Sequence, residues 1–256
     1  MFTNSEEKKG KIILLFGRAG LGKSTLAHNC PLQQAHIELE DTGMEGRNHK
    51  RVTLDMIRKH WSDLGGNFPA AINSLALKAK EDGAEVIVLD TIGQLDELIT
   101  NWILRMNGWK SLEDPGFGKG HQLLREEMMK VTRSIIDIAQ VHKLHVIALA
   151  HTQVESLVEF DGSVREVMSP KFGSVKADKA PYRETLIGNC YIVGQVRQQV
   201  FGAKDGRQSG GQIVVDMGSS PGSISKCRQN GINKVIQIDM TGKAFWDVIT
   251  PILKGV

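Results

Sequence analysis

The sequence predicts an α/β fold with a mostly parallel central sheet, flanking helices and a strand-rich C-terminal part. Three observations predict it. Short apolar runs recur over the first 150 residues, helix-length segments separate them, and strand-like runs follow one another beyond residue 190. With 256 residues, 41% hydrophobic and 24% charged, the chain has a globular composition. We expect a single domain over residues 1–256, with 1–10 as a flexible tail.

The elements follow from these runs in chain order. The first strand is expected at 11–16, because the apolar run KIILLF ends at a glycine, and a helix opens at about Lys23. Further strands are expected at 36–39, 84–89, 144–150, 191–200, 212–216 and 234–239. Helices are expected at 69–82, 93–105, 121–142 and 243–252.

Two segments interrupt this alternation and are expected to be loops. Residues 107–120 carry four glycines and a proline, and residues 152–180 contain the hairpin-type turn signal Asp161-Gly162. Long loops inside a compact domain usually carry function or are disordered.

Composition excludes several classes of protein. No apolar run is long enough to span a membrane, and the first residues do not read as a signal peptide, so we expect a cytoplasmic protein without a membrane partner. The three cysteines form no CxxC pair, which argues against a disulfide framework or zinc knuckle. A net charge of +3 does not by itself indicate nucleic acid as a partner.

The most specific motif is a phosphate-binding loop. Gly17 to Ser24 match GxxxxGK[ST] between a buried strand and a helix, which is the context that this motif requires. Its glycines let backbone N–H groups wrap phosphates, Lys23 reaches the β and γ phosphates, and Ser24 ligates Mg²⁺. The expected nucleotide-binding residues are Gly17, Arg18, Ala19, Gly20, Leu21, Gly22, Lys23, Ser24 and Thr25.

An acidic residue on a later strand completes the predicted magnesium site. Asp90 ends the apolar run Val86–Leu89, which places a carboxylate at the edge of the sheet beside the phosphate loop. We interpret Asp90 as the Walker B aspartate, and expect a nucleoside triphosphate and Mg²⁺ to bind here.

The residue after Asp90 is Thr91, so the base that activates water must come from elsewhere. Glu40, which follows the strand at 36–39, is the best candidate, and Glu38 and Asp41 are competing carboxylates. A solvated acidic strand end is the alternative that this pattern leaves open.

The order of these motifs resembles the RecA-type recombinase core. The features that carry the resemblance are the phosphate loop, Ile37-Glu-Leu-Glu40, Val88-Leu-Asp-Thr91 and His151-Thr-Gln153. They are most similar to phage RecA-like ATP-binding proteins associated with single-strand annealing. The resemblance implies that Glu40 activates water and that His151, together with Gln153, senses the γ phosphate.

The resemblance also implies a site completed by a second subunit and a DNA partner. The pair Lys226-Cys-Arg228 would reach a neighbour's ATP in a homo-oligomer. The two loops would bind single-stranded DNA, with Phe117 and Phe172 as further stacking residues. The DNA-binding candidates are Trp109, Lys110, Lys119, Arg165, Lys171, Lys176 and Lys179.

Together with its motifs, the resemblance implies a Mg²⁺-dependent ATPase of RecA-like type that acts in phage-type recombination or annealing, located in the host cytoplasm if phage-encoded. An annealing or single-strand-binding protein would be a further partner. Two other functions stay open: a P-loop kinase for a small molecule or nucleotide, and an ATP-switched loader that does not contact DNA.

Overall fold

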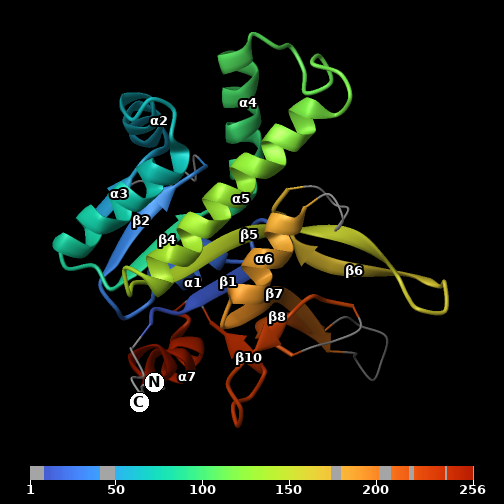
Figure 1. Cartoon of the computed structure of the whole chain (residues 1–256). Helices are drawn as coiled ribbons and strands as arrows, with labels where there is room; N and C mark the ends of the chain where they lie inside the picture. Colours follow the sequence, from blue (N-terminus) through green and yellow to red (C-terminus); the bar gives the residue numbers. More distant parts are fainter. Residues whose placement is uncertain are drawn as a thin grey trace, which may run out of the picture.

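A single sheet of ten strands connects the described part of the chain in this computed structural model (Figure 1). The structure describes residues 9–40, 50–173, 180–201, 209–218, 222–239 and 241–255. The strands are β1 (Ile12–Gly17), β2 (Gln34–Glu38), β3 (Lys50–Val52), β4 (Val86–Asp90), β5 (His145–Val158), β6 (Val164–Pro170), β7 (Ile192–Phe201), β8 (Ser209–Asp216), β9 (Lys226–Cys227) and β10 (Val235–Ile238). The helices are α1 (Lys23–His28), α2 (Leu54–Asp63), α3 (Phe68–Glu81), η1 (Ile92–Gln94), α4 (Leu95–Asn107), α5 (Lys119–Gln140), α6 (Pro181–Asn189) and α7 (Lys243–Lys254).

The strand order is β10-β8-β7-β1-β5-β4-β2-β3, with β6 paired to β5 and β9 to β7. The six strands from β7 to β3 in that order are all parallel, and β6, β8, β9 and β10 join antiparallel. This arrangement confirms the predicted mostly parallel sheet with added strands in its C-terminal part.

Helices cover both faces of the sheet, and β1 shows why. Its alternate residues Ile12, Leu14 and Phe16 pack with α2 to α6, while Ile13 and Leu15 face α1 and α7. All five side chains are buried, as a central parallel strand requires.

Most predicted elements are found within a few residues of their expected bounds. Several segments differ from the prediction. Residues 152–170 are not a loop, because β5 continues to Val158 and pairs with β6 across a turn at Asp161-Gly162. The helices α2 and α6 and the short strands β3 and β9 were not expected, and α2 places Trp61 in the core.

None of the helices in the described residues is both long and apolar enough to cross a membrane. Cys30 and Cys190 are buried free thiols, and Cys227 is a partly exposed one.

Candidate active site

The phosphate-binding loop leaves β1 at the carboxyl edge of the parallel sheet. Gly17 has no space for a side chain, because a Cβ there would lie 2.4 Å from the Val196 carbonyl oxygen of β7. Gly20 and Gly22 have φ angles of 78° and 79°, a left-handed conformation that glycine adopts without steric cost. The motif glycines are therefore required by close strand packing at one position and by backbone conformation at the other two.

Lys23 lies inside this loop. It is only 6% exposed, and its Nζ donates hydrogen bonds to the carbonyl oxygens of Gly17 and Arg18, each at 3.0 Å. Burial lowers the pKa of Lys23, while the charges of Asp90 and Glu40 oppose that shift. The ammonium is thus held in the loop by the carbonyls of the loop itself and by two nearby carboxylates.

Asp90 ends β4 and is 3% exposed. Burial raises the pKa of this carboxyl, whereas a hydrogen bond from Ser24 and the charges of Lys23 and His151 lower it. Its Oδ1 atom is buried and has no hydrogen-bond partner among the described residues. An unsatisfied carboxylate oxygen beside a serine hydroxyl is a donor set of the kind that Mg²⁺ prefers, so Asp90 and Ser24 fit the predicted metal role.

Glu40 lies where β2 has ended, and two groups orient its carboxylate. Thr91 Oγ1 donates a hydrogen bond to Glu40 Oε2 at 3.1 Å, and His151 Nε2 lies 3.4 Å from the same oxygen. Glu38, the competing carboxylate, is 9% exposed and lies 3.9 Å from Arg51 of β3 instead. Asp41 lies outside the described residues.

The strand order explains why these residues meet. β5 lies between β1 and β4, so His151 is paired in register with Gly17 and is one strand away from the Walker B strand. In β2 and β4, Glu38 is paired with Asp90, which places Glu40 beyond the carboxyl edge next to Thr91. Thr91 was the contact that sequence reasoning missed, although its position directly after Asp90 was a usable signal.

Gln153, the second predicted sensor, follows two residues after His151 on β5. Its Nε2 atom is buried without a hydrogen-bond partner among the described residues. The side chain therefore has one donor available to a bound ligand or a rearranged neighbour.

Comparison with known proteins agrees with this geometry. Residues 9–229 match the model of a family described as AAA domain. The chain belongs to this family. Its phosphate loop, Walker B strand and mostly parallel sheet are those of a P-loop NTPase.

Other comparisons are more distant. No curated protein matches the sequence. The solved crystal structure of the RadB recombinase is similar at 15% identity and a TM-score of 0.46, over 92% of this chain and 90% of that chain. The assignment to the AAA domain family does not depend on that likeness.

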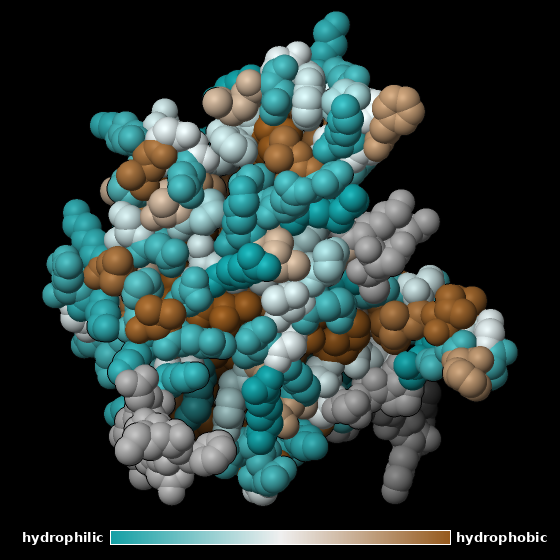
Figure 2. Space-filling model, in the orientation of Figure 1, coloured by the Kyte–Doolittle hydropathy of each residue, from teal (hydrophilic) through white to brown (hydrophobic). Residues whose placement is uncertain are grey.

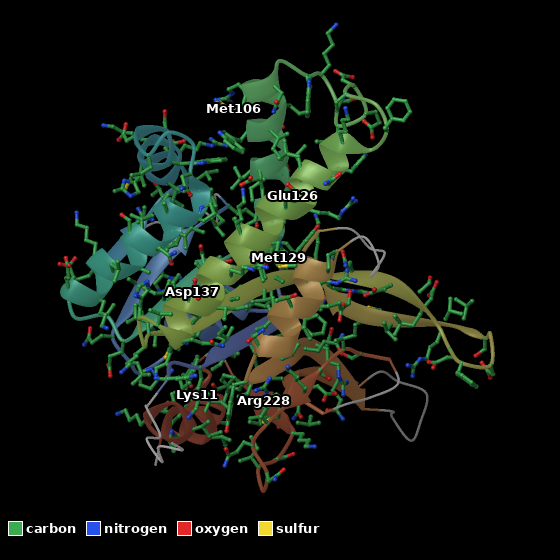
Figure 3. The ribbon with its side chains drawn as sticks, in the orientation of Figure 1. Lys11, Met106, Glu126, Met129, Asp137 and Arg228 are labelled. Atoms are coloured by element: carbon green, nitrogen blue, oxygen red, sulfur yellow. The ribbon has the colours of Figure 1, made fainter. Side chains whose placement is uncertain are left out.

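Lys226 and Arg228 lie near the amino end of β1, whereas the phosphate loop follows the carboxyl end of this strand. Arg228 N donates to Tyr191 O, and Tyr191 N donates to Ile12 O at the beginning of β1. Arg228 and Lys11 line one cavity there, and Figure 3 shows them near each other. Since Gly17 is five strand residues of about 3.3 Å further on, this pair does not contact the phosphate loop of its own chain.

The residues predicted to bind DNA have several surroundings. Lys110 and Lys119 are exposed around the α4–α5 connection, and Phe117 there is fully exposed. Trp109 is partly buried against the core. Arg165 pairs with Glu159 at 2.8 Å, Lys171 is exposed after β6, and Lys176 and Lys179 lie outside the described residues.

The prediction that Phe172 stacks on DNA bases is wrong for this structure. Its ring is 1% exposed and packs edge-on against Tyr182 of α6. An aromatic ring in this position stabilises the core, because its apolar surface is removed from water.

Proposed function

We propose that this protein hydrolyses ATP with Mg²⁺ and couples hydrolysis to single-stranded DNA in phage-type recombination or annealing. The observation that carries the proposal is the contact of Glu40 with Thr91 and His151 beside the buried Lys23 and Asp90. A carboxylate held by two side chains at the carboxyl edge of a P-loop sheet is placed to orient water.

In the proposed reaction, Glu40 orients a water molecule and accepts its proton as the water oxygen attacks the γ phosphorus. The bond from phosphorus to the bridging oxygen breaks, which gives ADP and phosphate. Lys23 offsets negative charge on the β and γ phosphates, and Asp90 and Ser24 would hold Mg²⁺, which supplies further charge stabilisation when bound. His151 touches Glu40 and lies beside Gly17, so it is positioned to respond to the γ phosphate.

The DNA part of the proposal has separate support. The α4–α5 connection follows the Walker B strand and presents Lys110, Phe117 and Lys119 to solvent. Exposed lysines bind phosphates, and an exposed aromatic ring can stack on an unpaired base for about 1 to 3 kcal/mol. In a homo-oligomer, Lys226 and Arg228 of a neighbouring copy would complete the ATP site.

The test is the steady-state ATPase rate with Mg²⁺, with and without single-stranded DNA, over a series of salt concentrations. The proposal expects a rate that DNA raises and that salt reduces, because phosphate contacts release counterions. Lys23→Ala should remove nucleotide binding and turnover. Turnover that DNA leaves unchanged at low salt would contradict the DNA role, and phosphate transfer to an added acceptor would favour a kinase.

A further inference from the structure

The hairpin of β5 and β6 carries an exposed apolar surface that no other part of the described residues covers. Val154, Val158, Phe160 and Val164 are 48%, 74%, 109% and 66% exposed. The hairpin projects from the body of the molecule (Figure 1), and Figure 2 shows apolar surface along it. Gathered apolar side chains of this kind mark a contact surface.

The tip of this hairpin is ordered by its own hydrogen bonds. Glu159 N donates to Ser163 O at 2.8 Å, and Ser163 N donates to the Asp161 side chain at 2.9 Å. Gly162 has a φ of 82°, which suits the turn. The backbone of the turn that carries Phe160 is therefore ordered, so little backbone entropy is lost when the turn binds.

The base of the hairpin is anchored as firmly as its tip. Arg183 of α6 is fully buried and donates a hydrogen bond to Glu155 of β5 at 2.6 Å. Because this ion pair fixes the start of the hairpin against the core, the projecting part keeps one direction.

A cleft on another part of the molecule has complementary chemistry. It has a volume of about 750 Å³ and lies between α2, the turn after α2 and α4. Trp61, Leu98, Trp102 and Met106 give it an apolar lining, and Arg58 and Arg105 add two positive charges. Arg58 lies 3.4 Å from Asp55, and Arg105 forms no ion pair with any described residue.

The hairpin tip matches this cleft in two respects. The tip sequence Val158-Glu-Phe-Asp161 alternates apolar and acidic residues, and the cleft combines indole rings with guanidinium groups. Arginine binds carboxylates through paired N–H donors, and aromatic rings pack on one another with favourable geometry. Glu159 is paired with Arg165 of the same hairpin, so Asp161 is the tip carboxylate that can pair with the cleft.

The two surfaces face away from each other in one chain. The hairpin projects to one side, whereas Met106 on α4 and the neighbouring α2 lie on the other (Figures 1 and 3). The tip therefore has no access to the cleft of its own chain, and the partner that carries a matching cleft is a second copy.

We propose that the hairpin tip, Val158 to Asp161, of one copy inserts into the α2–α4 cleft of the next copy. Phe160 packs on Trp102 beside Met106, and Asp161 pairs with Arg105, which forms no ion pair with a described residue. Such a contact uses two different surfaces, so repetition gives a ring or a filament rather than a closed pair. The inference rests on the homo-oligomer of the proposed function and names the surface that forms it.

The experiment measures the mass of the full chain by sedimentation velocity over a range of protein concentrations. The unaltered protein should associate, and Phe160→Asn or Arg105→Glu should weaken self-association about tenfold or more. Phe117→Asn is the matched control, since Phe117 is 102% exposed but lies outside the cleft and the hairpin. An unaltered protein that stays monomeric, or a control as defective as Phe160→Asn, would overturn the proposal.

Mixing the two defective variants gives the decisive result. Phe160→Asn keeps an intact cleft and Arg105→Glu keeps an intact tip, so together they should form a one-to-one dimer and nothing larger. Absence of this dimer would overturn the interface even if both variants are folded by circular dichroism.

The same variants separate this inference from the proposed function. If Phe160→Asn and Arg105→Glu assemble normally while Lys23→Ala loses ATP turnover, the interface is wrong and the ATPase stands. If the variants dissociate as expected while the unaltered protein does not hydrolyse ATP, the interface stands and the proposed function fails.

Discussion

The two halves of β5 have opposite surroundings. From Val146 to Ala150 the strand is fully buried between parallel neighbours, whereas from Thr152 to Val158 it has one antiparallel neighbour and exposes Val154 and Val158. His151 lies at the junction and contacts Glu40.

This difference indicates which two surfaces of the chain are candidates for function. At the nucleotide edge, charged groups are buried: Lys23 and Asp90 are 6% and 3% exposed. On the hairpin, apolar groups are exposed. Both placements are unfavourable for an isolated folded chain, and such exceptions to burial by polarity are expected at functional surfaces.

The largest expected effect is on the nucleotide edge. Glu40→Gln removes the proton acceptor and should lower kcat by about 10²- to 10⁴-fold while ATP binding is retained. Steady-state ATPase assays and equilibrium ATP titration measure the two quantities. Glu38→Gln, two residues away, is the control and should stay within a few-fold of the unaltered rate. Equal losses in both variants would contradict the assignment of Glu40.

The next effect is at the base of the hairpin, where the two regions meet. Arg183→Met leaves Glu155 as an unpaired buried charge and should cost about 3 to 5 kcal/mol of unfolding free energy. Urea denaturation measures this loss. The double variant with Glu155→Leu should recover most of it, because no buried charge is then left. A loss below about 1 kcal/mol would show that the pair is not buried as described.

The two halves of β5 can be compared directly by shortening one side chain to alanine in each half. Ile147 is completely buried, so Ile147→Ala should cost about 2 to 5 kcal/mol of unfolding free energy. Val158→Ala should change it by at most about 0.5 kcal/mol, because that side chain is 74% exposed. Denaturation at low protein concentration measures both without contributions from assembly. Similar losses would remove the distinction between the halves.

The smallest expected effect is a pH dependence of the free energy of unfolding, caused by His145 at the beginning of β5. Burial lowers the pKa of His145 below its ordinary 6.5, and Lys11 acts in the same direction. Below pH 6.5 the unfolded chain therefore binds a proton that the folded chain does not. The free energy of unfolding consequently decreases as the pH is lowered. One proton gives a slope of up to about 1.4 kcal/mol per pH unit until the folded pKa is reached.

Unfolding free energies at pH 7.5 and 5.5 check this dependence. His145→Gln should reduce the slope, since the side-chain amide can accept the hydrogen bond that Lys11 N now donates to His145 Nδ1 at 3.0 Å. An unchanged slope in that variant would assign the pH dependence to other groups.

The nucleotide edge was the part of the molecule most accessible from the sequence. An apolar run followed by Gly17 to Ser24, and Val86–Leu89 followed by Asp90, each predict a strand end beside a phosphate site, and parallel strands bring such ends together. The contact of Glu40 with Thr91 and His151 required the strand order, which spacing alone does not give.

The hairpin and the two unexpected helices were not predicted from the sequence, and the reasons differ. Charged residues such as Glu155 and Arg165 in the 152–170 segment interrupt the apolar alternation of a strand, although Asp161-Gly162 indicated the turn. In α6, a buried arginine at 183 and a glycine at 188 obscure the helical pattern. Burial of Arg183 depends on its pairing with Glu155, which only the tertiary structure supplies.

Because β5 is one continuous strand, it connects the nucleotide edge to the hairpin tip without a break. Seven residues separate His151 from the hairpin turn, a length of roughly 24 Å at about 3.4 Å per residue. If the Glu155–Arg183 pair opened, a tilt of about 5° where His151 meets Glu40 would move the tip by roughly 2 Å, which is comparable to the shifts that reseat side chains at subunit interfaces. With that pair closed, the arm stays fixed to the core, so the ion pair decides whether a rotation near the phosphate loop would reach the tip.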